Sequence, residues 1–104
     1  MMSNGWLAID YREFYDVPRL IVVEYGGELF VFDALFDDHA DEYADEFTVR
    51  RLPKSARSLV NDSSWVPLVG IGEFVGTVPV QDVEFDPTRR SAIRSKVFET
   101  LRLA

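Results

Sequence analysis

The fold of this chain is decided by residues 19–36, which read RLIVVEYGGELFVFDALF. Two apolar runs rich in β-branched and aromatic residues flank Gly26 and Gly27, and such runs are typical of strands. A Gly-Gly pair accepts the positive φ angles that a two-residue hairpin turn requires. A turn of that length predicts three cross-strand pairs, which are Tyr25 with Glu28, Val23 with Phe30 and Ile21 with Phe32.

Side chains alternate between the two faces of a strand, so this register also sorts the hairpin residues by face. Val22 and Val31 fall on one face, beside the polar Glu24 and Asp33. The other face carries four large apolar side chains and is the expected core of the domain. It carries Ile21, Val23, Phe30 and Phe32.

The composition is that of one folded globular domain over residues 1–104. Hydrophobic residues make up 47% of the chain and aromatic residues 13%, which is enough for a self-sufficient core. The chain contains no cysteine, which excludes disulfides, a thiolate nucleophile and cysteine-based metal centres. Residues 1–14 lack a signal-peptide pattern, and the apolar runs fall far short of the ~20 residues of a membrane helix. These features predict a cytoplasmic protein that does not contact a membrane.

Strand-like segments lie on both sides of the hairpin. Residues 6–15 alternate, with Leu7, Ile9 and Tyr11 on one side, and we expect Val17-Pro18 to end this strand. Residues 47–50 alternate again and predict a third strand of the same meander. After Pro53, residues 54–61 predict a short helix and residues 62–64 a turn.

The segment 65–85 predicts two or three short strands separated by glycines. Gly76 lies inside one of them, and an interior glycine often marks a bulge or tight bend. Proline cannot donate to a strand ladder, so Pro79 predicts an edge strand or a bulge.

The C-terminal part predicts one amphipathic helix over about residues 87–102. Asp86 is a favourable N-cap residue, and Pro87 suits the first helical position. The apolar stripe of this helix comprises Ile93, Val97, Phe98 and Leu101.

Together these elements predict a mainly β (α+β) fold, with five or six short antiparallel strands within residues 6–85 followed by the helix. Strongly bent, glycine-punctuated strands in a short chain suit a small antiparallel β-barrel of SH3-like form. The alternative is a strongly bent, half-open sheet with the helix packed across one face or end.

The net charge of −7 belongs to a single segment, residues 33–46. The eleven acidic and eleven basic residues elsewhere in the chain cancel. The segment itself contains no Lys or Arg, and its acidic residues are Asp33, Asp37, Asp38, Asp41, Glu42, Asp45 and Glu46. Two explanations stay open. Either the basic face of the predicted helix, with Arg89, Arg90, Arg94 and Lys96, neutralises the segment, or the segment faces solvent and serves a partner.

The acidic segment does not have the pattern of a metal site. Asp37, His39 and Asp41 fall at the 1-3-5 spacing of a calcium loop. The sixth position is Glu42 instead of glycine, however, and the twelfth is Thr48 instead of a bidentate glutamate. His39 is the only histidine and has no recognisable nucleophile partner. We therefore predict no metal, no cofactor and no catalytic residue.

These observations favour a non-enzymatic protein-interaction module with an acidic surface loop that meets a basic protein partner. A more specific alternative is an inhibitor or immunity-type protein that presents carboxylates to a basic enzyme. Another is a small-ligand binder or enzyme with a carboxylate-lined pocket. The net negative charge argues against nucleic acid as a partner. The predicted interaction residues are Asp37, Asp38, Asp41, Glu42, Asp45, Glu46, Tyr43 and Tyr15.

Overall fold

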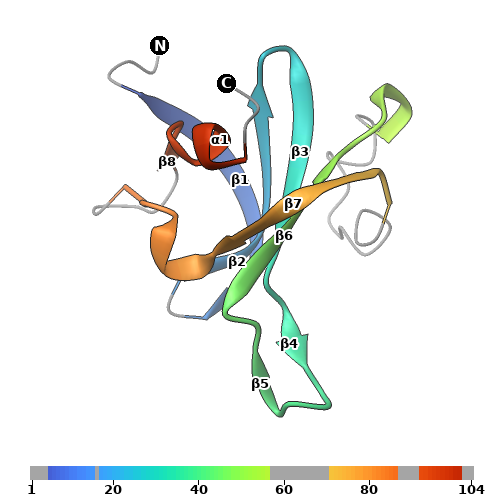
Figure 1. Cartoon of the computed structure of the whole chain (residues 1–104), viewed down its shortest axis with the longest axis vertical. Coiled ribbons are helices and arrows are strands. Elements are labelled where there is room, and N and C mark those ends of the chain that lie inside the picture. The colour runs from blue at the N-terminus through green and yellow to red at the C-terminus, as the bar shows by residue number, and fades with distance from the viewer. Residues whose placement is uncertain (1–4, 16, 57–70, 87–91, 102–104) are drawn as a thin grey trace.

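The computed structural model describes residues 5–15, 17–56, 71–86 and 92–101, and it is mainly β (Figure 1). Six strands form one antiparallel sheet in the order β7-β6-β3-β2-β1-β8, and two further strands, β4 and β5, form a separate hairpin. The elements are β1 (Trp6–Tyr15), β2 (Val17–Tyr25), β3 (Glu28–Asp33), β4 (Phe36–Asp37), β5 (Glu42–Tyr43), β6 (Glu46–Arg51), β7 (Glu73–Pro79), a 3-10 turn (Val80–Asp82), β8 (Ala92–Arg94) and helix α1 (Val97–Thr100).

The register predicted for the β2–β3 hairpin is confirmed. Gly26 and Gly27 both have positive φ angles, of 63° and 82°, as a tight two-residue turn requires. All three predicted pairs are present, namely Tyr25 with Glu28, Val23 with Phe30 and Ile21 with Phe32.

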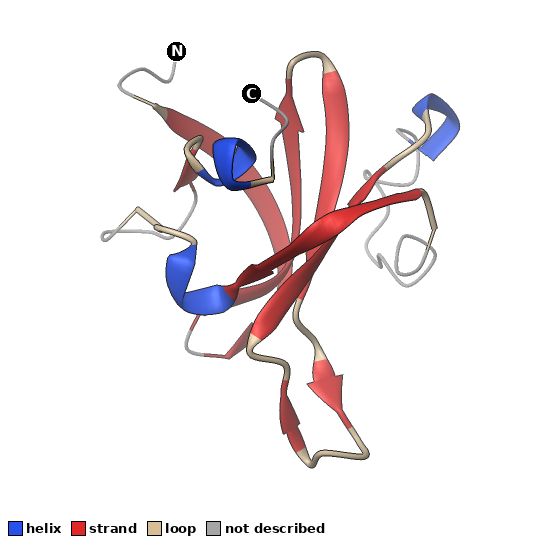
Figure 2. Ribbon diagram, in the orientation of Figure 1, coloured by secondary structure: helices blue, strands red, loops and turns tan. Residues whose placement is uncertain are grey.

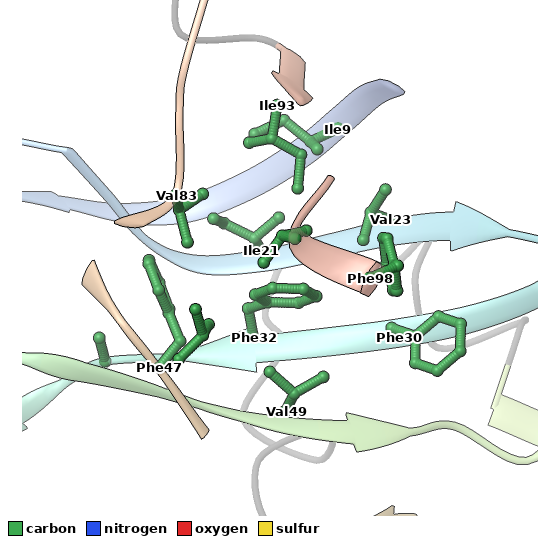
Figure 3. Close-up of a cluster of buried hydrophobic side chains, with 13 residues drawn as sticks. Ile9, Ile21, Val23, Phe30, Phe32, Phe47, Val49, Val83, Ile93 and Phe98 are labelled. Atoms are coloured by element: carbon green, nitrogen blue, oxygen red, sulfur yellow. The ribbon is translucent and has the colours of Figure 1, made fainter. Parts of the chain in front are cut away.

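The main core lies on the concave face of the sheet, against α1 (Figure 3). The ring of Phe32 lies 5.9 Å from the ring of Phe47 on β6 and 5.9 Å from the ring of Phe98 on α1, measured between centroids. Phe98 also stacks on Tyr25 at 4.2 Å. The four residues predicted for this face, Ile21, Val23, Phe30 and Phe32, are all buried.

The opposite face of the sheet is not purely polar. Val22 and Val31 lie on it as predicted, but both are buried in a second, smaller apolar cluster. Leu20, Leu52 and Ala56 complete this cluster. The central strands are thus apolar on both faces, which explains why residues 20–23 form an unbroken apolar run.

The flanking strands agree with the predictions, except at one boundary. β1 covers residues 6–15 with Ile9 in the core, and β6 includes the predicted strand 47–50. β2 starts earlier than expected, because Val17 and Pro18 already pair with Tyr15 and Phe14. A proline near the first residue of a strand removes only one ladder donor and is tolerated there.

β7 is an edge strand of the sheet, as Pro79 predicted. Pro79 is its last residue, and the β6–β7 register shifts between Val49 and Arg50, close to Gly76. Residues 54–56 form a 3-10 turn in place of the start of the predicted helix. The rest of that helix, the turn at 62–64 and the strand residues 65–70 lie outside the described residues.

The prediction of a helix over residues 87–102 is wrong in its extent. Residues 92–94 form strand β8 on the outer edge of β1, where Ile93 pairs with Leu7 and bridges to Phe85. The helix comprises only Val97–Thr100, although Val97 and Phe98 are buried as the stripe predicted. Strand pairing prevails at Ile93 because it satisfies the open edge of β1 and buries the side chain at the same time. The predicted helix start at Pro87 lies outside the described residues.

The described strands do not close into a barrel. The two edge strands, β7 and β8, are not paired with each other, and α1 lies across the concave side between them (Figure 2). The side chain of Leu101, which follows α1, lies next to Gly76 of β7. The arrangement is therefore the bent, half-open sheet with a helix packed across one face. None of the described helices is long and apolar enough to cross a membrane.

Phe32→Ala should lower the free energy of unfolding by about 3–5 kcal/mol, because it empties a fully buried aromatic site between two other rings. Phe74→Ala is the matched control, since Phe74 is 57% exposed, and it should cost about 1 kcal/mol or less. Urea or thermal unfolding of both variants checks this. An unchanged melting temperature for Phe32→Ala would contradict the assignment of the core.

Candidate protein-interaction surface

Most of the acidic segment folds as a hairpin that projects from the sheet (Figure 1). We call residues 36–46 the acidic hairpin. Its two short strands, β4 and β5, pair Phe36 with Tyr43 and Asp37 with Glu42. Asp37 accepts two backbone hydrogen bonds in the turn between β4 and β5, because its Oδ1 receives the N–H of His39 at 2.9 Å and that of Ala40 at 3.4 Å.

Asp33 differs from the other six acidic residues of the segment. It ends β3, next to Thr48 of β6, and its side chain is half-buried. Burial raises the pKa of the Asp33 carboxyl above its usual 3.8, and the nearby Arg50 guanidinium offsets only part of this effect. The structure therefore separates Asp33 from the acidic surface.

The six carboxylates of the acidic surface are Asp37, Asp38, Asp41, Glu42, Asp45 and Glu46, and all six residues are exposed. Among the described residues, none of them forms an ion pair. Two of the basic residues expected to neutralise them, Arg94 and Lys96, instead pair with Glu84, at N–O distances of 3.5 and 2.9 Å. That explanation is therefore wrong for Arg94 and Lys96, and Arg89 and Arg90 lie outside the described residues.

Two aromatic side chains stand at the base of the acidic hairpin. Phe36 is 47% exposed and packs edge-on against Tyr43, with ring centroids 5.3 Å apart. Tyr43 is half-buried. The predicted residue Tyr43 thus belongs to this surface together with Phe36, which the sequence reasoning did not include.

Arg19 is the second residue that the sequence reasoning missed. It is only 8% exposed. Its Nη1 donates to the carbonyl oxygen of Ala44 at 2.8 Å, and its guanidinium carbon lies 5.1 Å from the centroid of the Tyr43 ring. The alternation that placed Ile21 and Val23 in the core also places Arg19 on that face, so the signal was present.

An open groove lies where the base of the acidic hairpin meets the end of β7, at which point the N–H of Val80 donates to the carbonyl oxygen of Asp45 at 2.9 Å. Residues 43–46 line one side and residues 79–81 the other, and Arg19 also contributes to the wall. Asp45 and Glu46 supply carboxylates to this groove. The groove is shallow and open, whereas the concave face of the sheet is filled by side chains.

The predicted residue Tyr15 lies away from the acidic hairpin in the chain, at the end of β1. Its backbone pairs with Val17, and its side chain is outside the described part of the structure. Two aromatic residues that precede it on β1, Tyr11 and Phe14, lie 6.1 Å apart between ring centroids, and Phe14 is 51% exposed.

The described residues contain no group of three or more His, Asp or Glu side chains placed to hold a metal ion. His39, which falls at the third position of the calcium-loop spacing, is exposed on the acidic hairpin.

Comparison with protein-family models, with curated proteins and with solved structures finds no match.

The acidic hairpin should not bind a divalent cation tightly, because Asp37 already uses one carboxylate oxygen in the turn and its neighbours are hydrated. Calorimetric titration with calcium, magnesium, zinc and manganese should give only weak, salt-sensitive heats. A one-to-one site of micromolar affinity that is lost in Asp37→Asn or Asp41→Asn would overturn this expectation.

Asp33→Asn should stabilise the protein near neutral pH. Because the pKa of Asp33 is raised on folding, the folded state binds its proton more tightly, and stability falls as the pH rises through the folded-state pKa. Asparagine has a similar shape and carries no charge. The advantage of the variant should be present at about pH 7 and should vanish at about pH 3, where the wild-type carboxyl is protonated in both states.

Urea unfolding at both pH values measures this difference. If Asp33→Asn is less stable than the wild type near neutral pH, attraction to Arg50 outweighs the cost of burying the carboxylate.

Proposed function

We propose that this chain is a non-enzymatic protein-interaction module whose acidic hairpin binds a basic surface of another protein. The observation that carries the proposal is the set of six exposed carboxylates without ion pairs among the described residues. Five lie on the part of the acidic hairpin that projects from the sheet, and the sixth, Glu46, is the first residue of β6. The other charged groups of the described residues include pairs such as Glu84 with Lys96 and Arg51 with Glu73. Charge is thus concentrated at one place on the molecule.

The arrangement has the two parts that a protein-binding surface uses. Exposed charges around a contact steer a partner of opposite charge and raise the rate of association. An aromatic side chain among these charged residues supplies apolar surface that becomes buried when the partner binds. Phe36 and Tyr43 provide such an aromatic centre, with Asp37 and Glu42 next to them on the same short strands.

The more specific form of the proposal is an inhibitor or immunity-type protein for a basic enzyme. A projecting hairpin can enter the concave active site of another protein, which a flat acidic face cannot do. The carboxylates of the acidic hairpin would then occupy the place of a negatively charged substrate. The SH3-like barrel predicted from the sequence is unconfirmed, since the described strands form an open sheet, and this function does not depend on it.

A small-ligand binder or enzyme is the second candidate, and the groove at the base of the acidic hairpin is the observation that favours it. Asp45 and Glu46 line this groove. Its openness makes it better suited to an extended segment of a partner than to a small molecule, because small-molecule sites enclose most of the ligand surface.

Replacing Asp37, Asp38, Asp41 and Asp45 with asparagine should abolish partner binding and leave stability unchanged or higher. The charges repel one another and lack ion pairs among the described residues, so removing four of them relieves repulsion. The substitution Asp37→Asn keeps a side-chain oxygen that can accept the turn hydrogen bonds. Affinity capture from the native lysate at low and high salt, together with urea unfolding, measures both effects.

The matched control changes four exposed acidic residues elsewhere: Asp10→Asn, Glu13→Gln, Asp82→Asn and Glu99→Gln. This variant has the same net charge as the first one but should still capture the partner. A salt-sensitive loss of stability in the hairpin variant, with the same proteins captured as by the wild type, would refute the interaction hypothesis and show that the charges are paired internally.

A further inference from the structure

One residue of β2, Arg19, contacts the chain at both ends of the acidic hairpin. Its backbone carbonyl accepts the N–H of Ala34, two residues before the acidic hairpin begins, at 2.8 Å. The side chain of Arg19 reaches the second arm, where it donates to the carbonyl of Ala44 at 2.8 Å and lies over the ring of Tyr43. A single residue of β2 therefore contacts both ends of an element that leaves the sheet after β3 and returns at β6.

An arginine that is only 8% exposed as a whole residue calls for a physical reason at this position. Among the described residues, Arg19 is the one polar or charged residue in the buried class. Removing a charge from water is costly unless hydrogen bonds and aromatic contacts compensate. Leucine or methionine at this position would bury the same stem without that cost, so the charged head must contribute something that packing alone does not supply.

We propose that Arg19 is the positioning residue of the acidic hairpin and holds it at one fixed angle to the sheet. The planar guanidinium is suited to this role, because it fixes direction through its hydrogen bond to Ala44 and through its placement over Tyr43. The carboxylates are then presented to a partner by a pre-organised arm, which reduces the ordering entropy lost on binding. The consequence for binding rests on the proposed function, but the positioning itself is a property of the free chain.

Amide hydrogen exchange on the free protein tests the proposal. The amide of Ala44, which donates to Leu35 at 3.1 Å, reports on the hairpin base. The amide of Leu52, which donates to Leu29 at 2.8 Å at the far end of the sheet, reports on global opening. In Arg19→Met, which keeps the apolar stem and removes the donors and the charge, exchange at Ala44 should accelerate roughly tenfold or more, as expected for loss of a hydrogen bond from a charged donor.

Arg19→Lys is the conservative variant and should restore only part of the protection, because an ammonium group keeps the charge but lacks the planar fork. Exchange at Leu52 should stay close to the wild-type rate in both variants. If Arg19→Met does not fold, Tyr43→Leu decides the question, since it removes the ring beneath the guanidinium and leaves Arg19 and the Ala44 carbonyl in place. It should accelerate exchange at Ala44 by a smaller factor and leave Leu52 unchanged.

The proposal is overturned if exchange at Ala44 does not change in these variants, or if it accelerates only in step with Leu52. The latter result would mean that Arg19 contributes to global stability and not to the position of the hairpin. No partner is present in this measurement, so its failure would leave the proposed function standing. Conversely, loss of the proposed function would not alter the exchange result.

Discussion

The ring of Phe32 lies between the rings of Phe47 and Phe98, and the rest of the structure depends on this contact. It joins the central strand β3 to β6 on one side and to α1 on the other. A helix of four residues has no stability of its own in water, so α1 exists because Phe98 is buried in the concave face of the sheet. The sheet bends around these rings, and the position of its edge strands follows from that bend.

The same constraint extends to the acidic hairpin, because side chains along β2 alternate between the two faces of the sheet. With Ile21 and Val23 committed to the core face, Arg19 must lie on that face as well. It lies where the core ends and the acidic hairpin begins, so its stem continues the apolar surface while its head meets Tyr43 and Ala44. The register of the β2–β3 hairpin therefore determines where the acidic hairpin is attached.

The charged residues are not arranged by strand alternation, as the apolar residues are, but differ in whether they form ion pairs. At the two ends of the sheet, opposite charges are paired, as in Arg51 with Glu28 and Lys96 with Glu84. Within the part of the chain that the structure describes, the carboxylates of the acidic hairpin have no such ion pairs. Their exposure makes this tolerable, because like charges in water repel weakly. A carboxylate that is partly buried is less favourable than an exposed one, as Asp33 shows: burial raises the pKa of its carboxyl.

The sequence by itself determined the β2–β3 register and the strands over residues 6–15 and 47–50. It also indicated an edge strand or a bulge at Pro79 and showed that the net negative charge belongs to residues 33–46. These features depend on local signals: a Gly-Gly turn, alternation over a few residues, a proline without a donor and uncompensated charge. Only the tertiary structure decided that Ile93 lies in a strand, that residues 36–43 pair as a hairpin and that Arg19 is buried. Each of these three features depends on a partner that is distant in the chain. Ile93 pairs with the open edge of β1, and Arg19 contacts Tyr43 and Ala44. The acidic hairpin forms because its two arms are attached to the ends of β3 and β6. The hydrogen bonds and buried area that such partners supply outweigh the local preferences that a sequence displays.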